Sequence, residues 1–327
     1  MVDWQPAAKL ETLRTRARML QSTRAFFSTR DMLEVDTPLL SAAATTDVHL
    51  ESFATVYRGP GAPKGRVLYL HTSPEFAMKR LLASGSGAIF QICKTFRQGE
   101  AGSQHNPEFT MLEWYRPHYD ATALMDEVEE LVATVLGEHV SLAPTERLTY
   151  AEAFKRFARV DDVHTADVAR LRTCARERAI SDVPGLGEDR DAWLDLLMSH
   201  VVQPQLGQHG PSLVYDYPAS QAALARVRIG PPDVAERFEL FINGIELANG
   251  FHELTDAIEQ RRRFESDRAR RQQRGLRDVP LDEHLLTALE SGLPPCAGVA
   301  LGFDRLVMLA TGARNIGEVM AFPIERA

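Results

Sequence analysis

Arg97 and Phe109 are the residues of this chain whose types and spacing first suggest chemistry. Arg97 ends an apolar, β-rich run (89–96), and Phe109 opens the next such run. The loop between them contains Gly99 and an Asn-Pro pair, which favour a turn. The arginine and the ring should therefore face each other across paired strands. A guanidinium can bind a phosphate in bidentate fashion while a ring packs against a base, so we expect a nucleotide site here.

A second group of residues lies on either side of Asn243-Gly244, a dipeptide that signals a hairpin between two apolar strands. Glu239 and Glu246 stand at similar distances from this turn, so we expect them to oppose each other across the strand pair. Two close carboxylates repel unless a cation lies between them. The Mg²⁺ that accompanies ATP suits such a site, because it takes few protein carboxylates and several phosphate oxygens. The alternative is a pair of exposed charges on an edge hairpin.

Further acids indicate the kind of substrate. Asn249, Phe251 and Glu253 alternate along one strand, so they should project to one face. Buried acids need cationic partners, and a pocket with several acids therefore favours a small dicationic substrate such as lysine or a lysine isomer. One amine would lie near Glu75, and the other near Glu113, Tyr115 and Glu253. The alternative explanation of Glu75 is an acid favoured by the helix dipole in a first turn.

Composition limits the function classes. The chain has 327 residues, 44% of them hydrophobic, and a net charge of -8, which argues against a general nucleic-acid binder. Its three cysteines are far apart and lack the spacing of a zinc site, so we expect reduced thiols. No apolar signal core or membrane-length window occurs, and we therefore expect a cytoplasmic protein without a membrane partner.

Hydrophobic periodicity predicts the elements that hold these residues. We expect helices over 7–30, 76–82, 121–136, 150–158, 165–179, 189–201 and 256–274. Strands are expected over 33–36, 68–71, 89–96, 109–115, 212–216 and 234–251. Thr72 or Ser73 should cap the helix at 76–82. The arginines of the helix at 256–274 alternate with acids, which favours a solvated face over a site for RNA or an acidic protein.

Several motifs resemble those of class II aminoacyl-tRNA synthetases, lysyl-tRNA synthetase in particular. Arg97 with the run HNPEFTMLE (105–113) resembles motif 2, and GVALGFDRL (298–306) resembles motif 3, with Asp304 expected to cap its helix. The run FELFINGIELANGFHEL (238–254) resembles the metal-binding strands, and residues 7–38 resemble the dimerisation motif. The resemblance implies an α+β fold, an antiparallel sheet flanked by helices. It would be one catalytic domain over 1–327, with a helical insertion at about 118–210 and no anticodon-binding domain.

The resemblance also implies roles for individual residues. Arg97 and Arg305 would be catalytic, and Glu239 and Glu246 would hold Mg²⁺. ATP would contact Arg97, Gln98, Gly99, Glu100, His105, Asn106, Phe109, Glu246, Leu247, Gly302 and Arg305. The amino acid would contact Ser73, Pro74, Glu75, Glu113, Tyr115, Asn249, Phe251, Glu253 and Ala300. The family has an acid where this chain has Gly99, so Glu100 or the loop backbone would replace it; His105 is explained equally well as a solvent-exposed loop residue.

Over its whole length the chain resembles the lysyl-tRNA synthetase paralogues that ligate (R)-β-lysine to translation elongation factor P. Ala300, where the synthetase has glycine, would favour a lysine with a displaced amino group. This resemblance implies an AMP-forming ligase with ATP and Mg²⁺, a homodimer, and no tRNA partner. The alternatives are a class II-like amide ligase with a small-molecule acceptor and a non-catalytic regulatory paralogue.

Overall fold

The computed structural model describes residues 4–180 and 185–327. These residues form two compact units, which we describe separately. The first unit comprises the chain up to residue 119 together with 130–140 and 255–327. The second comprises 120–129 and the described residues of 141–254. Helix α3 (Ala121–Leu136), whose bounds match the prediction, contributes residues to both units.

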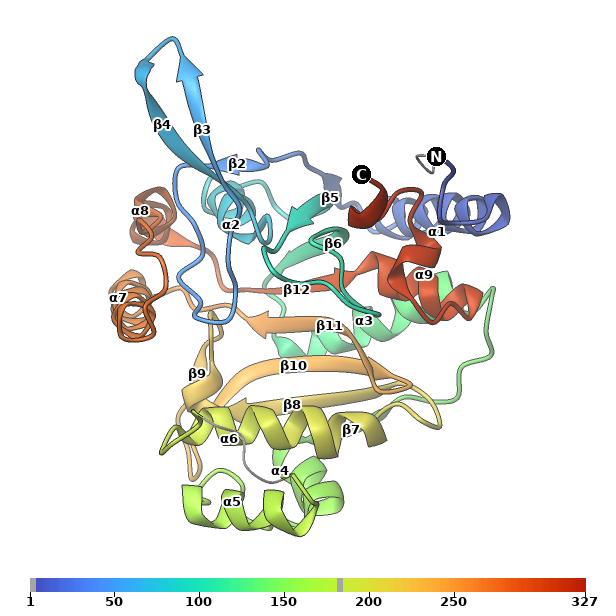
Figure 1. Cartoon of the computed structure of the whole chain (residues 1–327), viewed down its shortest axis with the longest axis vertical. Helices are drawn as coiled ribbons and strands as arrows, with labels where there is room; N and C mark the ends of the chain where they lie inside the picture. The colour runs from blue at the N-terminus through green and yellow to red at the C-terminus, as the bar shows by residue number, and fades with distance from the viewer. Residues whose placement is uncertain (1–3, 181–184) are drawn as a thin grey trace. The chain divides into compact units, whose positions relative to one another are not determined.

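The sheet of the first unit has β6 (Glu108–Pro117) between β5 (Ile89–Phe96) and β12 (Cys296–Gly302), both antiparallel to it. Strand β1 (Leu33–Glu34) pairs in parallel with β5. Most of β6 is buried, which suits its run of large apolar residues. A smaller antiparallel sheet consists of β2 (Leu40–Ser41), β4 (Ala62–Leu70) and β3 (Ala54–Gly59), and Figure 1 shows its long β3–β4 hairpin.

Helices flank these strands in the first unit. They are α1 (Leu10–Ser28), α2 (Glu75–Ala83), α7 (Ala257–Gln273), α8 (Glu283–Gly292) and α9 (Phe303–Thr311), followed by the short turns η5 (Ile316–Val319) and η6 (Ile324–Arg326). Helix α1 buries Phe27, which stacks on Phe90 at 4.5 Å between ring centres. Leu10, the first residue of this helix, is 67% exposed.

The sheet of the second unit has β10 (Val234–Ile242) between β11 (Ile245–His252) and β8 (Ser212–Pro218), both antiparallel to it. Strand β7 (Glu146–Thr149) pairs in parallel with β8, and β9 (Val227–Arg228) pairs with one end of β10. The helical segments are α4 (Tyr150–Ala153), η1 (Phe154–Ala158), α5 (Val168–Glu177), α6 (Arg190–Leu197), η2 (Met198–Val202), η3 (Gln203–Gln205) and η4 (Ala219–Gln221). The expected α+β class, with antiparallel strands flanked by helices, is confirmed.

The arginines of α7 behave differently from one another. Arg262 and Arg263 pair with Glu259 within the helix, as the interleaved charges predict. Arg271 differs from these two, because it is 1% exposed and donates to Glu51 and to the carbonyl oxygen of Asp47. It therefore fixes the segment before β3. Within the described part of the chain, no helix has the length and apolar character needed to cross a membrane.

Candidate active site

Arg97 and Phe109 lie together in the first unit, as predicted. The Arg97 backbone N–H donates to Pro107 O at 2.9 Å, and its guanidinium carbon lies 5.1 Å from the Phe109 ring centre. Glu100 Oε2 is 3.8 Å from Arg97 Nη1, while Gly99 turns the loop with a φ of +86°. The Nε of Arg97 is buried and has no hydrogen-bond partner among the described residues. This geometry suits an anion beside the guanidinium and a flat ring against Phe109.

Arg305 meets the same loop from the start of α9. Its Nη2 lies 2.7 Å from His105 Nε2, and its Nε donates to Gln104 O at 3.3 Å. Burial lowers the pKa of His105, and the charge of Arg305 lowers it further, so the neutral imidazole accepts this hydrogen bond. A methyl group built on Gly302 would lie 3.6 Å from Arg305, an ordinary contact. Packing therefore does not require glycine at this position.

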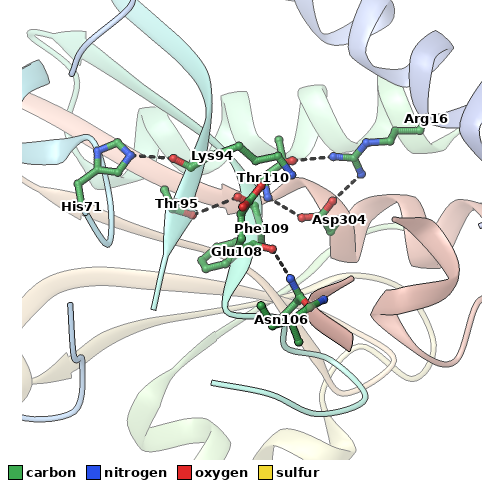
Figure 2. Close-up of polar contacts among 10 residues, drawn as sticks. Arg16, His71, Lys94, Thr95, Asn106, Glu108, Phe109, Thr110 and Asp304 are labelled. Atoms are coloured by element: carbon green, nitrogen blue, oxygen red, sulfur yellow. Dashed lines mark hydrogen bonds and ion pairs between the residues drawn. The ribbon is translucent and has the colours of Figure 1, made fainter. Parts of the chain in front are cut away.

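Asp304 does not cap α9, contrary to the prediction. Gly302 occupies the cap position, and Asp304 lies 1% exposed beneath the helix. Its Oδ2 accepts from the Thr110 backbone N–H at 2.6 Å, and its Oδ1 accepts from Arg16 of α1 (Figure 2). Arg16 also donates to Thr110 Oγ1 at 2.6 Å. This ion pair joins α1, β6 and α9 next to Phe109 and Arg305.

Asn106 is held by the chain itself. Its Nδ2 donates to Glu108 O, as Figure 2 shows, and its Oδ1 accepts from the Ile324 backbone N–H at 3.0 Å. Gln98, from the same loop, donates its backbone N–H to Glu51 O at 2.8 Å. These contacts give the loop a defined shape around Arg97.

Glu113 has a preorganised carboxylate. It is 2% exposed, and it accepts from Ser73 Oγ and from Tyr115 Oη, each at 2.7 Å. Ala300 is its register partner on β12, so the Ala300 methyl group lies on the same face beside it. These four residues come from three segments of the first unit and form one acidic, sterically defined site.

Glu75 begins α2 and bonds to a buried lysine. Lys79 Nζ, 1% exposed, donates to Glu75 Oε1 at 2.7 Å. The prediction that Thr72 or Ser73 occupies the N-cap position of this helix is wrong. Pro74 occupies it and supplies no side-chain hydrogen bond. Ser73 Oγ accepts from the Glu75 backbone N–H at 2.9 Å instead. Ser73 thus fixes Glu75 and Glu113 together.

The β10–β11 hairpin of the second unit carries the two expected metal acids. Asn243 and Gly244 turn with φ values of +52° and +71°, which confirms the hairpin. The expected opposition of the glutamates is wrong: Glu239 pairs with Asn249, and Glu246 pairs with Phe241. A bulge between these pairs includes buried Leu247 as the extra residue. Paired residues share a face, and Phe241 lies two positions from Glu239, so Glu246 lies on the face that carries Glu239. The bulge brings Asn249 to this face as well.

The electrostatics of this face fit a cation. Burial raises the pKa of Glu239, and the charge of Glu246 raises it further, while Arg237 lowers it. A divalent ion bound to both carboxylates would relieve their repulsion. No cluster of three or more potential ligands from Asp, Glu, His and Cys occurs among the described residues. Two carboxylates are enough for Mg²⁺, which takes its remaining ligands from water and phosphate oxygens.

Two residues of this site were missed from the sequence. Arg237 and Tyr217 each donate to Glu239, the latter from Oη at 2.6 Å. Arg237 precedes Glu239 by two positions in a strand, a spacing that signals a shared face. Asn249 and Phe251 project to this face too, as predicted, opposite Glu239 and Arg237. Glu253 is buried and forms an isolated backbone bridge with Ala225.

Comparison with known proteins agrees with these motifs. Residues 1–326 match the family model described as tRNA synthetases class II (D, K and N). The elongation factor P–(R)-β-lysine ligase of Pseudoalteromonas translucida is 55% identical over 324 residues, 99% of this chain and 98% of that protein. The protein of the same name from Edwardsiella ictaluri is 53% identical over 100% of this chain and 99% of that protein. The one from Salmonella arizonae is 51% identical over 99% of this chain and 98% of that protein. The chain therefore belongs to the class II tRNA synthetase family of the D, K and N type.

Proposed function

We propose that this protein activates (R)-β-lysine, or lysine, with ATP and transfers it to a lysine ε-amine of elongation factor P. The observation that carries the activation step is the guanidinium of Arg97, which lies against Phe109 with its buried Nε available to an anion. The names of relatives more than half identical over nearly their full length support the acceptor.

The first proposed step is attack of the substrate carboxylate on the α-phosphate of ATP, which releases pyrophosphate and leaves an aminoacyl-adenylate. In the second step the acceptor amine displaces AMP and forms an amide. No protein nucleophile is needed, because Arg97 and Arg305 bind and orient the phosphates and neutralise their charge. Glu239 and Glu246 would hold Mg²⁺, which supplies further charge neutralisation when bound.

The amino-acid site in this proposal is built on Glu113. Its carboxylate is fixed by Ser73 and Tyr115, so it can receive a substrate ammonium group without losing orientation. Ala300 beside it restricts the space that the substrate backbone can occupy. We infer that this methyl group favours a lysine whose amino group is displaced from the α-carbon.

We also propose a cytoplasmic homodimer. Leu33 on the outermost strand β1 is 55% exposed, and Leu10 of α1 is 67% exposed. Both belong to the region that resembles the dimerisation motif, and apolar side chains left in water there are expected to be covered by a second copy. Cys93, Cys174 and Cys296 are not joined in disulfides, which is compatible with this compartment.

The experiment that tests the function is ATP–pyrophosphate exchange with α-lysine, both enantiomers of β-lysine and an acidic amino acid. Incubation with ATP, each lysine and elongation factor P, followed by intact-mass measurement, tests the transfer. The matched control is elongation factor P with its acceptor lysine changed to arginine. Exchange with the acidic amino acid alone would favour the amide-ligase alternative, and binding without any exchange would favour a regulatory paralogue.

A further inference from the structure

Arg237 occupies the centre of a partly buried polar cluster in the second unit. It lies on β10 opposite Phe251, two residues before Glu239. Its Nη2 donates to Glu239 Oε1, and its Nε donates to Asn249 Oδ1 at 3.3 Å. One guanidinium therefore contacts the side chains of an acid on its own strand and an amide on the neighbouring strand.

Two further contacts restrict the position of this guanidinium group. Its carbon lies 4.6 Å from the Tyr217 ring centre, and its Nη1 donates to Gln221 O at 3.0 Å. Tyr217 donates from Oη to Glu239 Oε2 at 2.6 Å and packs against Tyr150, with 4.8 Å between ring centres. Both carboxylate oxygens of Glu239 are thus held by donors whose own positions are fixed by packing.

The contact with Asn249 sets the orientation of its amide. A guanidinium only donates hydrogen bonds, so the amide must turn Oδ1 toward Arg237 and present its Nδ2 hydrogens elsewhere. Burial by itself lowers the pKa of Arg237, but the charge of Glu239 outweighs this and the pKa rises. The side chain therefore remains charged and keeps its donor character at any physiological pH.

We propose that Arg237 is a positioning residue that couples the metal-binding carboxylate of Glu239 to the substrate-binding amide of Asn249. Its planar guanidinium group positions Glu239 for the metal and Asn249 for the substrate. A displacement of either side chain would therefore be transmitted to the other. This inference rests on the proposed function, which assigns Glu239 and Asn249 to those two ligands. Arg237 touches neither ligand in this scheme.

The test compares Arg237→Lys with Tyr217→Phe and with Arg228→Lys as the matched control. Lysine keeps the charge but cannot span both partners, because its ammonium is a single point donor. We expect Arg237→Lys to raise the KM for ATP and the KM for the lysine substrate by about 10-fold each, with a smaller effect on kcat. Tyr217→Phe should raise only the KM for ATP. Arg228, half-exposed and paired with Asp216, should change neither.

Calorimetric titration with Mg·ATP in the absence of amino acid provides a readout other than activity. Affinity should fall in Arg237→Lys and Tyr217→Phe and stay unchanged in the control. If Arg237→Lys does not fold, Asn249→Ser replaces it in this experiment. Coupling through Arg237 predicts that Asn249→Ser binds Mg·ATP about 5-fold more weakly than the wild type does. Unchanged ATP affinity in that variant overturns the inference.

The two proposals fail differently. A wild-type protein that exchanges pyrophosphate with no lysine isomer overturns the proposed function. An active wild type whose Arg237→Lys variant has the kinetics of Arg228→Lys overturns the coupling role alone. A rise in the KM for ATP without a rise in the KM for lysine also contradicts the coupling role, because it would confine Arg237 to the metal side.

Discussion

Replacement of Arg16 by methionine should destabilise the protein strongly, although Arg16 lies outside every sequence motif assigned to a ligand. The change would remove the cation that faces Asp304, whose carboxylate is 1% exposed. The carboxylate would then lose one hydrogen-bond donor and keep the bond from the Thr110 backbone N–H. Removing one partner of a buried ion pair costs about 3–5 kcal/mol. The Arg16 side chain is 15% exposed, so water can replace part of its contact, and we expect about 3 kcal/mol.

The free energy of unfolding, measured by urea titration, checks this value. A loss of about 3 kcal/mol corresponds to a fall in Tm of about 4 °C for a chain of this size, because the entropy of unfolding scales with chain length. Arg14→Met is the matched control, since Arg14 is exposed on the same helix and its loss should change stability by less than about 0.5 kcal/mol. The KM for ATP should also rise in Arg16→Met, because Asp304 directly precedes Arg305.

A double-mutant cycle isolates the ion pair from the packing of the arginine stem. Asp304→Asn keeps an acceptor for Thr110 but removes the charge, so the Arg16→Met/Asp304→Asn variant should be more stable than the two single effects predict. We expect a coupling energy of at least about 1 kcal/mol. Additive effects, or an Arg16→Met variant as stable as Arg14→Met, would refute the reasoning.

Three further predictions follow from single residues. Ala300→Gly should raise the ratio of kcat/KM for α-lysine over that for β-lysine by about 10-fold in pyrophosphate exchange; an unchanged ratio would contradict the steric role. Burial raises the pKa of Cys93 to about 12, so iodoacetamide should alkylate it at least about 100-fold more slowly in the native chain than in urea, by mass spectrometry. The pKa of His105 lies below its usual value, so its neutral form persists at neutral pH and is lost on acidification. The KM for ATP should then rise as the pH is lowered below the ordinary pKa of histidine, because imidazolium forms beside Arg305, and His105→Gln should remove that rise.

Local patterns determined much of what was predicted correctly. The bounds of α3 and the strands that meet at Arg97 and Phe109 follow from hydrophobic periodicity. The turn at Asn243-Gly244 follows from the two positive φ angles that these residues tolerate. Each of these features depends on residues a few positions apart, so the sequence contains the information directly.

The register of the β10–β11 hairpin is a feature that local sequence patterns did not predict. Counting residues outward from the turn places Glu239 opposite Ala248, but the bulge at Leu247 shifts the pairing and places Glu239 opposite Asn249. A bulge arises from packing on both faces of a sheet rather than from the composition of one strand. The face on which an acid lies could therefore be guessed, but its partner could not.

By itself, the sequence determined the motifs, the strands and turns that carry them, and the kind of chemistry that arginines and paired acids can support. Only the tertiary structure decided which distant groups hold those side chains in place. Asp304 bonds to Arg16, 288 positions away, rather than to its own helix terminus, and Glu239 bonds to Arg237 and Tyr217. A buried charge takes whichever donor the packed fold brings within reach, and that proximity depends on long-range contacts, which residue spacing along the chain does not encode.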